Sequence, residues 1–221
     1  MFYFNVTFLA VLGVFLSNSA GAQEVAEGAS GKAFEWSATY KGELVSNRSG
    51  GISQGTDFLG NLDLKLTLDT GKISGWQGGK FFLYGLYDHG GKPSQRVGDA
   101  QVTSNIETPV TTFKLHEAYL EQTLPGDRMS LLLGLHDLNA SFYSNESAGI
   151  FMNSSFGIGA DLAQTGDNGP SIFPTTSMAV RLSGQVTDKL SLQAAVFDAI
   201  PGSLNDPRGT HVSLASDEGA S

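Results

Sequence analysis

A guanidinium, a hydroxyl and an amide stand at alternate positions of one segment, as Arg181, Ser183 and Gln185. Residues two apart lie on the same face of a β-strand, so these three groups would form one hydrogen-bonding row. Such a row can donate to and accept from the hydroxyls of a polar solute. The alternative is that Arg181 pairs with a neighbouring acid inside the fold and contacts no solute.

A second row is chemically similar but less regular. Glu117, Tyr119 and Glu121 share one face of an expected strand, where they would offer two carboxylates and a phenol to the same solute. Lys114 and His116 then fall on the opposite, apolar face, where a charge is out of place. A β-bulge in this strand, or positions near the rim of the apolar face, would reconcile the pattern.

No motif in the sequence supports bond-making chemistry or metal binding. Residues 51–55 match G-x-S-x-G, but a polar turn precedes them and no helical pattern follows, so we do not interpret Ser53 as a nucleophile. The four histidines are dispersed, the acidic residues lack calcium-loop spacing, and the chain has no cysteine. We therefore predict no catalytic residue, no metal ligand and no cofactor.

The composition indicates an all-β protein with many turns. The 221 residues include 28 glycines, and only 16% of them are charged. Ordinary soluble domains contain about 7% glycine and about 25% charged residues. Thirteen basic residues against 22 acidic ones leave a net charge of −9. This excludes a nucleic-acid partner, because a basic surface would be needed to replace the counterions of the phosphates.

Alternation of apolar and polar residues predicts the strands that would position these side chains. The clearest case is residues 62–68, where four leucines alternate with Asp63, Lys65 and Thr67, a spacing that favours a strand over a helix. Seven segments show a pattern of this kind: residues 34–44, 62–68, 79–87, 112–123, 129–137, 178–186 and 190–196.

These strands are about 9–12 residues long, and short turns alternate with long loops between them. Soluble sandwiches use shorter strands, of about 5–6 residues. Transmembrane barrels use strands of about 9–11 residues with an apolar face to lipid, a polar face to the lumen, short periplasmic turns and long outer loops. We therefore predict an antiparallel transmembrane β-barrel of the outer-membrane type, with the polar rows facing its lumen.

The longest irregular stretch is residues 139–176. Loops of more than about 12–15 residues are usually functional or disordered, and the aromatic side chains of this one argue against disorder. Two alternatives remain open. The stretch folds into the barrel and narrows it, with Phe156 and Phe173 available to a solute, or it covers the mouth as an outer cap.

Residues 1–22 are predicted to be a cleavable signal peptide, so that the mature chain would begin at Gln23. Val6–Leu16 is an apolar core of 11 residues, and the Ala-Gly-Ala run that ends at residue 22 has the small-x-small pattern of a cleavage site. The segment before the core lacks Lys and Arg, which leaves an uncleaved N-terminal anchor as the alternative. Export without cysteines is typical of the bacterial envelope.

Several loop segments carry a specific likeness to a known family. They are residues 134–139 (GLHDLN), 153–159 (NSSFGIG), 169–174 (GPSIFP), 196–198 (VFD) and 216–220 (SDEGA). With these segments the mature chain resembles the carbohydrate-selective porins of the OprB family over nearly all of its length. The resemblance implies an outer-membrane barrel through which small sugars pass by diffusion.

In one respect the chain departs from this family. Its members continue beyond the Asp-Glu-Gly-Ala run for about as many strands again, whereas this sequence stops at Ser221. Seven strands are also an odd number, and bacterial single-chain barrels use an even one. We therefore expect residues 23–221 to form the N-terminal part of a porin barrel, incomplete here and with two open sheet edges.

The leading hypothesis is thus an outer-membrane porin for passive diffusion of small carbohydrates, with the lipid bilayer and the permeating sugar as its partners. The alternative is a secreted, soluble β-sheet module for carbohydrate binding or adhesion. A glycoside hydrolase would need two carboxylates that flank a cleft, and no spacing singles out such a pair. The candidates for pore lining or sugar contact are Arg181, Glu117, Tyr119, Glu121, Gln185, Phe156 and Phe173.

Overall fold

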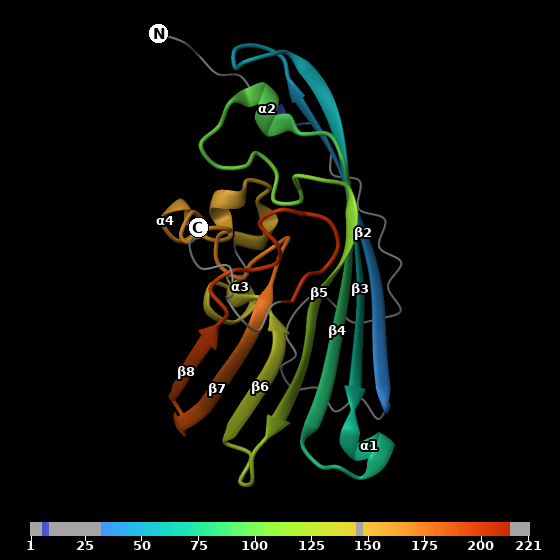
Figure 1. Cartoon of the computed structure of the whole chain (residues 1–221), viewed down its shortest axis with the longest axis vertical. Helices are drawn as coiled ribbons and strands as arrows, with labels where there is room; N and C mark the ends of the chain where they lie inside the picture. Colours follow the sequence, from blue (N-terminus) through green and yellow to red (C-terminus); the bar gives the residue numbers. More distant parts are fainter. Residues whose placement is uncertain (1–5, 9–31, 145–147, 213–221) are drawn as a thin grey trace.

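The computed structural model describes residues 6–8, 32–144 and 148–212, which form one curved antiparallel sheet (Figure 1). The strands lie in sequence order, and each pairs with the next along the chain. They are β1 (Val6–Phe8), β2 (Phe34–Asn47), β3 (Gly55–Asp69), β4 (Gly79–Gly90), β5 (Thr112–Thr123), β6 (Met129–His136), β7 (Ser177–Thr187) and β8 (Leu190–Phe197). The predicted all-β antiparallel fold is confirmed.

The predicted strand segments correspond to β2–β8, and some observed strands are longer. β3 begins at Gly55 instead of residue 62, because Gly60 interrupts the apolar alternation without interrupting the pairing with β2. The connection between β3 and β4 contains a short helix, α1 (Thr70–Ser74). Its first turn is capped by the Asp69 carboxylate, which accepts the backbone N–H of Lys72 at 3.2 Å.

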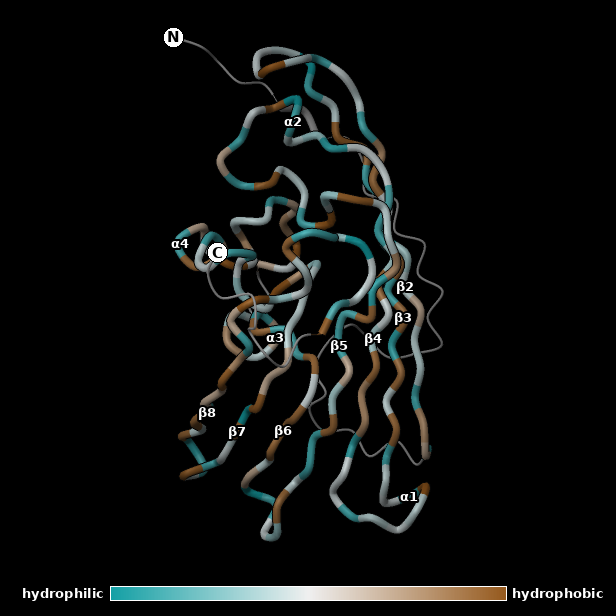
Figure 2. Tube along the Cα trace, in the orientation of Figure 1, coloured by the Kyte–Doolittle hydropathy of each residue, from teal (hydrophilic) through white to brown (hydrophobic). Residues whose placement is uncertain are grey.

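One face of the sheet, here called the outer face, is apolar and exposed. On β7, Val180, Leu182 and Val186 are 46%, 42% and 56% exposed. The strand register also aligns one row across β2–β5 on this face: Tyr40, Leu62, Tyr87 and Phe113. Hydrophobic and hydrophilic residues accordingly alternate along the strands (Figure 2). Such rows are typical of the lipid-facing side of a transmembrane barrel.

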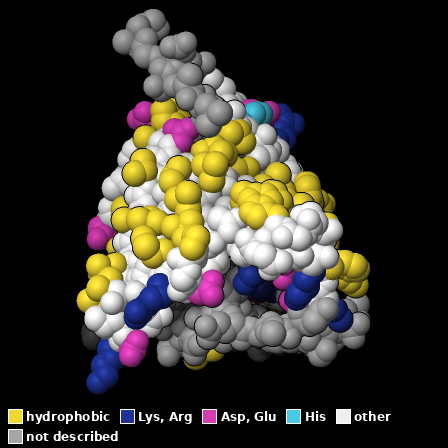
Figure 3. All heavy atoms as spheres, turned by 90° about the horizontal axis from the view of Figure 1, so that it is seen from below, with side chains coloured by type: hydrophobic (Ala, Val, Ile, Leu, Met, Phe, Trp, Pro, Cys, Tyr) yellow, Lys and Arg dark blue, Asp and Glu magenta, His cyan; other side chains and the backbone are white. Residues whose placement is uncertain are grey.

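The long loops lie on the opposite face, here called the inner face, and contain the remaining helical turns. These are α2 (Pro93–Val97), α3 (Leu138–Phe142), η1 (Ala148–Ile150), η2 (Ser154–Phe156) and α4 (Ala160–Ala163). Ile106 packs on Val45 and Leu59 in a small buried cluster. The two longest loops are joined to each other, because Asn105 N donates to Met152 O at 2.6 Å. Seen from the end with the short turns, a group of basic and acidic side chains lies beside a hollow (Figure 3).

Within the described residues the sheet is open, since its outermost strands β1 and β8 do not pair with each other. An incomplete barrel has this form. The predicted signal peptide lies outside the described residues, apart from the backbone of β1, which runs beside residues 45–47 of β2. None of the helices in the described part of the chain is long and apolar enough to cross a membrane.

Candidate functional site

A bulge in β5 turns a row of polar side chains toward the inner face. Leu115 and Glu117 pair with consecutive residues of β4, so His116 is the extra residue of the bulge. The prediction that Lys114 and His116 lie on the apolar face is therefore wrong, because both are buried on the inner side, where they are 6% and 3% exposed. The bulge is one of the two explanations that the sequence pattern had left open.

Arg181 joins two strands and a loop by hydrogen bonds. Its Nη2 donates to Glu121 Oε1 at 2.7 Å, and its Nη1 donates to Ser141 Oγ at 2.6 Å. Ser130 Oγ donates to the same Glu121 oxygen at 2.7 Å. The Arg181 and Glu121 side chains are 14% and 19% exposed, so the pair is largely but not fully shielded from solvent.

Ser141 also contacts a second, more deeply buried group. Its hydroxyl lies 2.7 Å from His136 Nε2, and His136 Nδ1 lies 2.8 Å from Glu117 Oε1. Glu117 accepts the backbone N–H of Asp137 at 3.0 Å as well. Together these side chains form what we call the inner-face network: Glu117, Glu121, Ser130, His136, Ser141 and Arg181.

A further polar group lies on β2–β4 of the same face. Tyr84 Oη donates to Asp63 Oδ1 at 2.7 Å, and Lys41 Nζ lies 3.4 Å from Asp63 Oδ2. Lys65 Nζ sits 4.6 Å from the centre of the Tyr84 ring, within the range of a cation–π contact. The inner face thus offers both donors and acceptors across most of the sheet.

Of the predicted aromatic residues, Tyr119 lies beside the inner-face network and Phe173 lies beside the buried His116. The Tyr119 ring is edge-on to the His136 ring, with 5.2 Å between their centres. The Phe173 ring, near the end of the long loop, is 6.2 Å from the His116 ring. Three further predicted residues are members of the network itself: Arg181, Glu117 and Glu121.

Gln185 and Phe156, which were also predicted, are not brought to the network. Gln185 is exposed near the short-turn end of β7, where its backbone N–H donates to Arg128 O at 2.8 Å. Phe156 belongs to η2, is 45% exposed and stacks on Phe151 with 4.2 Å between ring centres. A shared strand face with Arg181 and a place in the long loop were therefore not sufficient to bring these two residues to the network.

Among the inner-face residues that the sequence reasoning missed are His136, Ser141 and Asp63. His136 and Asp63 stand at polar positions of alternating strand segments, so the strand period held a signal for both. Ser141 had no such signal, because it lies in the short helix α3 and contacts the sheet only through the path of the loop.

The chemistry of this site is hydrogen bonding by fixed, charged groups. Ser141, His136 and Glu117 follow the order hydroxyl, imidazole, carboxylate, which nucleophilic triads share. Here, however, the Arg181 guanidinium donates to the Ser141 oxygen at 2.6 Å, so this hydroxyl takes part in holding a charged side chain in place. Over residues 32–144 and 148–212, no group of His, Asp and Glu side chains is placed to hold a metal ion.

Comparisons with known proteins agree with this geometry. The profile of the carbohydrate-selective porin, OprB family, matches residues 53–221. The high-pH structure of Pseudomonas putida OprB is similar with a TM-score of 0.64 at 20% identity, over 76% of this chain and 41% of that one. This chain therefore spans less than half the length of that porin. No curated protein sequence gives a significant match. Because the matched profile covers well over half of its residues, the chain belongs to the OprB family of carbohydrate-selective porins.

Proposed function

We propose that this chain forms part of the wall of an outer-membrane pore through which small carbohydrates diffuse passively. The observation that carries the proposal is the inner-face network, a set of paired charges and hydroxyls on the reverse side of an exposed apolar sheet. The apolar side suits lipid and the polar side suits a water-filled lumen.

A sugar that passes this wall exchanges hydrogen bonds with water for hydrogen bonds with the protein. Arg181 supplies donors and Glu121 supplies acceptors, and their mutual contact holds both in place. Groups that are already ordered cost little entropy when they bind, so a weak and rapidly reversible contact results. In this role Arg181 and Glu121 contact solute, while Glu117 and His136 fix the loop that carries Ser141.

The stretch 139–176 is proposed to narrow the pore. Near its start, Ser141 bonds Arg181, and near its end Ser171 Oγ donates to His136 O at 2.7 Å. A stretch that is bonded to the inner face at both ends supports inward folding over an outer cap. Phe156, an exposed residue in the middle of this stretch, is a proposed stacking surface for the solute.

The orientation follows from the lengths of the connections. Outer-membrane barrels have short periplasmic turns and long external loops, which assigns α1 to the periplasmic side and α2 to the outside (Figure 1). Residues 1–22 would direct export and then be removed, which leaves the mature chain in the bacterial outer membrane. We propose no enzymatic activity and no resident cofactor.

The test is uptake of a radiolabelled monosaccharide into liposomes that contain the full-length protein. We expect the wild-type protein to take up the sugar. Arg181→Ala and Glu121→Ala should each change the half-saturating sugar concentration by about tenfold, which corresponds to the loss of one hydrogen bond from a charged group. Arg48→Ala, at an exposed loop position, is the matched control and should leave uptake unchanged. Liposomes that remain impermeable to monosaccharides would overturn the proposal.

A further inference from the structure

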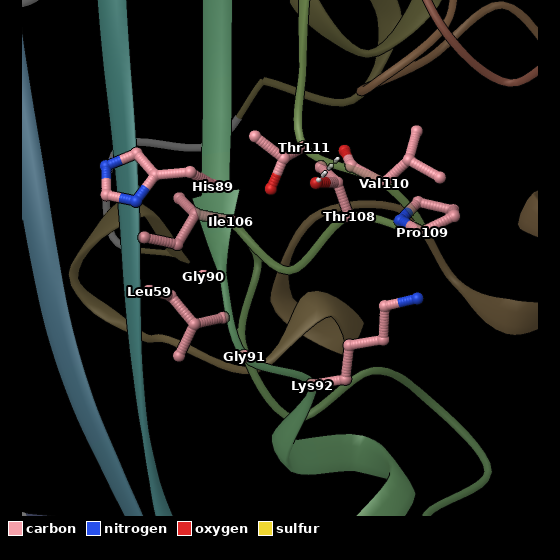
Figure 4. A pocket seen from close by; sticks show the side chains of 10 residues that line it. All are labelled: Leu59, His89, Gly90, Gly91, Lys92, Ile106, Thr108, Pro109, Val110 and Thr111. Carbon is pink, nitrogen blue, oxygen red and sulfur yellow. Dashed lines mark hydrogen bonds between the residues drawn. The ribbon is translucent and has the colours of Figure 1, made fainter.

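A cavity of about 260 Å³ lies at the end of the sheet next to α2, apart from the inner-face network. It opens between the end of β4, the residues that lead into α2 and the loop that precedes β5 (Figure 4). The residues that line it are Leu59, His89, Gly90, Gly91, Lys92, Ile106, Thr108, Pro109, Val110 and Thr111. No residue of this set belongs to the inner-face network.

The walls of the cavity are amphipathic. Leu59 and Ile106 form a rigid apolar part, since they are 1% and 4% exposed and belong to one buried cluster. Thr108 and Thr111 add two hydroxyls. Thr108 Oγ1 donates to Val110 O at 3.2 Å, which leaves its lone pairs available to accept a hydrogen bond.

Lys92 supplies the strongest donor of this cavity. The side chain is half-buried and extends toward Pro109 in Figure 4. Within the described part of the chain, its ammonium has neither a hydrogen-bond nor an ion-pair partner. The neighbouring acids are already bonded, because Arg96 Nε donates to Asp57 at 2.6 Å and Ser94 Oγ donates to Glu107 at 2.8 Å.

We propose that this cavity binds one neutral hexose ring, as a first docking site on the outer side of the pore. The inference rests on the proposed function and adds a second sugar site to it. A sugar ring has an apolar C–H face, which suits Leu59 and Ile106, and a rim of hydroxyls, which suits Lys92 and the two threonines. Drug-sized ligands occupy pockets of about 300–1,000 Å³, so this cavity suits a smaller ligand.

The charge around the cavity argues for a neutral sugar over a sugar acid. Burial raises the pKa of Glu107, and the nearby charges of Asp99 and Asp57 raise it further. With Arg96 paired to Asp57, Lys92 faces two further carboxylates, so the cavity does not offer the excess positive charge that an anion would need. Lys92 therefore acts as a hydrogen-bond donor to hydroxyl oxygens, as charged donors readily do.

The test is calorimetric titration of the full-length protein in detergent with glucose. Lys92→Met keeps the length of the side chain but removes the donor, and it should weaken the Kd by about tenfold. Thr108→Val combined with Thr111→Val should weaken it further. Lys189→Met, in the short turn at the opposite end, is the matched control and should leave the Kd unchanged. Thr111→Phe, which fills the cavity, should abolish the same binding step.

The outcomes separate this inference from the proposed function. Loss of glucose binding in Lys92→Met, with liposome uptake retained at high sugar concentration, supports both. If Lys92→Met loses glucose binding and the wild-type protein does not permeabilise liposomes, the result supports the cavity site and refutes the pore. Binding that Arg181→Ala removes and the cavity variants leave intact overturns the cavity site, as does the absence of any saturable glucose binding. Glucuronate that binds as tightly as glucose would overturn the preference for a neutral sugar.

Discussion

The outer and inner faces of β7 carry opposite kinds of side chain one residue apart. Val180 and Leu182 are 46% and 42% exposed, whereas the Arg181 side chain between them is 14% exposed and bonded to Glu121 and Ser141. A water-soluble protein has the reverse arrangement, with its apolar side chains inside. The sheet is therefore matched to an apolar medium outside and to a polar space inside.

The two faces depend on different interactions. On the outer face, the proposed pore would gain stability from lipid that covers the apolar rows, and single contacts would matter little. On the inner face, each charged group depends on particular partners, because a buried charge that loses its partner is strongly unfavourable. A substitution that places a polar side chain on the outer face, or an apolar one on the inner face, should thus change the free energy of unfolding by different amounts on the two faces.

The largest effect is expected for Glu117→Ala. The Glu117 and His136 side chains are 8% and 4% exposed, and Glu117 also accepts the backbone N–H of Asp137. Removing the carboxylate leaves both donors without their partner, which should cost about 3–5 kcal/mol in the free energy of unfolding. Urea titration of the full-length protein in lipid vesicles measures this cost. Glu35→Ala, at an exposed position of β2, should change it by less than about 0.5 kcal/mol. Equal costs at the two sites would contradict the role of the network.

A somewhat smaller effect is expected for Leu133→Arg on the outer face. Leu133 is 53% exposed near the middle of β6, a position at which water would accept arginine readily. In a bilayer the same charge costs about 2–4 kcal/mol at the midplane. The same vesicle titration should show this loss, while Ser183→Arg on the inner face of β7 should cost much less. A Leu133→Arg protein as stable as the wild type would mean that lipid does not cover this face.

Two glycines extend the comparison to backbone packing. A Cβ at Gly134, whose φ is 142°, would lie 2.2 Å from Ala118 O and 2.6 Å from Tyr119 Cα, which are backbone atoms that cannot move aside. A Cβ at Gly60 would meet only the ends of the Tyr40 and His89 side chains. Gly134→Ala should therefore cost about 1–3 kcal/mol, and Gly60→Ala clearly less. Thermal unfolding of both variants in one lipid checks the order, which the reverse ranking would refute.

The smallest expected effect is a pH dependence of the loop that contains Glu107. Burial raises the pKa of this carboxyl, against the hydrogen bonds from Ser94 that lower it. A raised pKa in the folded loop gives stability that is fully present below the ordinary glutamate pKa of about 4.3 and is lost as the pH rises through the higher folded value. Amide-exchange protection of residues 103–108 should fall over that interval and should not do so in Glu107→Gln. Protection that rises instead would give the opposite sign and contradict the assignment.

Local periodicity was sufficient to predict the strands, because each strand has one face in a uniform environment. Leu62 to Leu68 alternates without interruption, and β3 contains that segment. The bulge at His116 was not assigned from the sequence. The pattern left a bulge and a position near the rim as alternatives for Lys114 and His116, and only the pairing of β5 with β4 decides between them.

The site was predictable only where strands form it. Arg181 and Glu121 stand on alternating strands, so their face follows from their position, although their contact across the sheet does not. Ser141 reaches Arg181 over 40 residues of sequence, and Thr175 reaches Lys114 over 61. Such contacts depend on the path of the loop, which is determined by tertiary packing and leaves no period in the sequence.

The most direct test of the two-face account is a fluorescence quenching measurement. The chain has no cysteine, so single cysteines at Val180 and Ser183, labelled with one environment-sensitive dye, can be compared without background. In proteoliposomes of the full-length protein, we predict that brominated lipid quenches the dye at position 180 and that aqueous iodide quenches it at position 183. Iodide quenching at both positions with no effect of brominated lipid would contradict the account and favour a soluble carbohydrate-binding module.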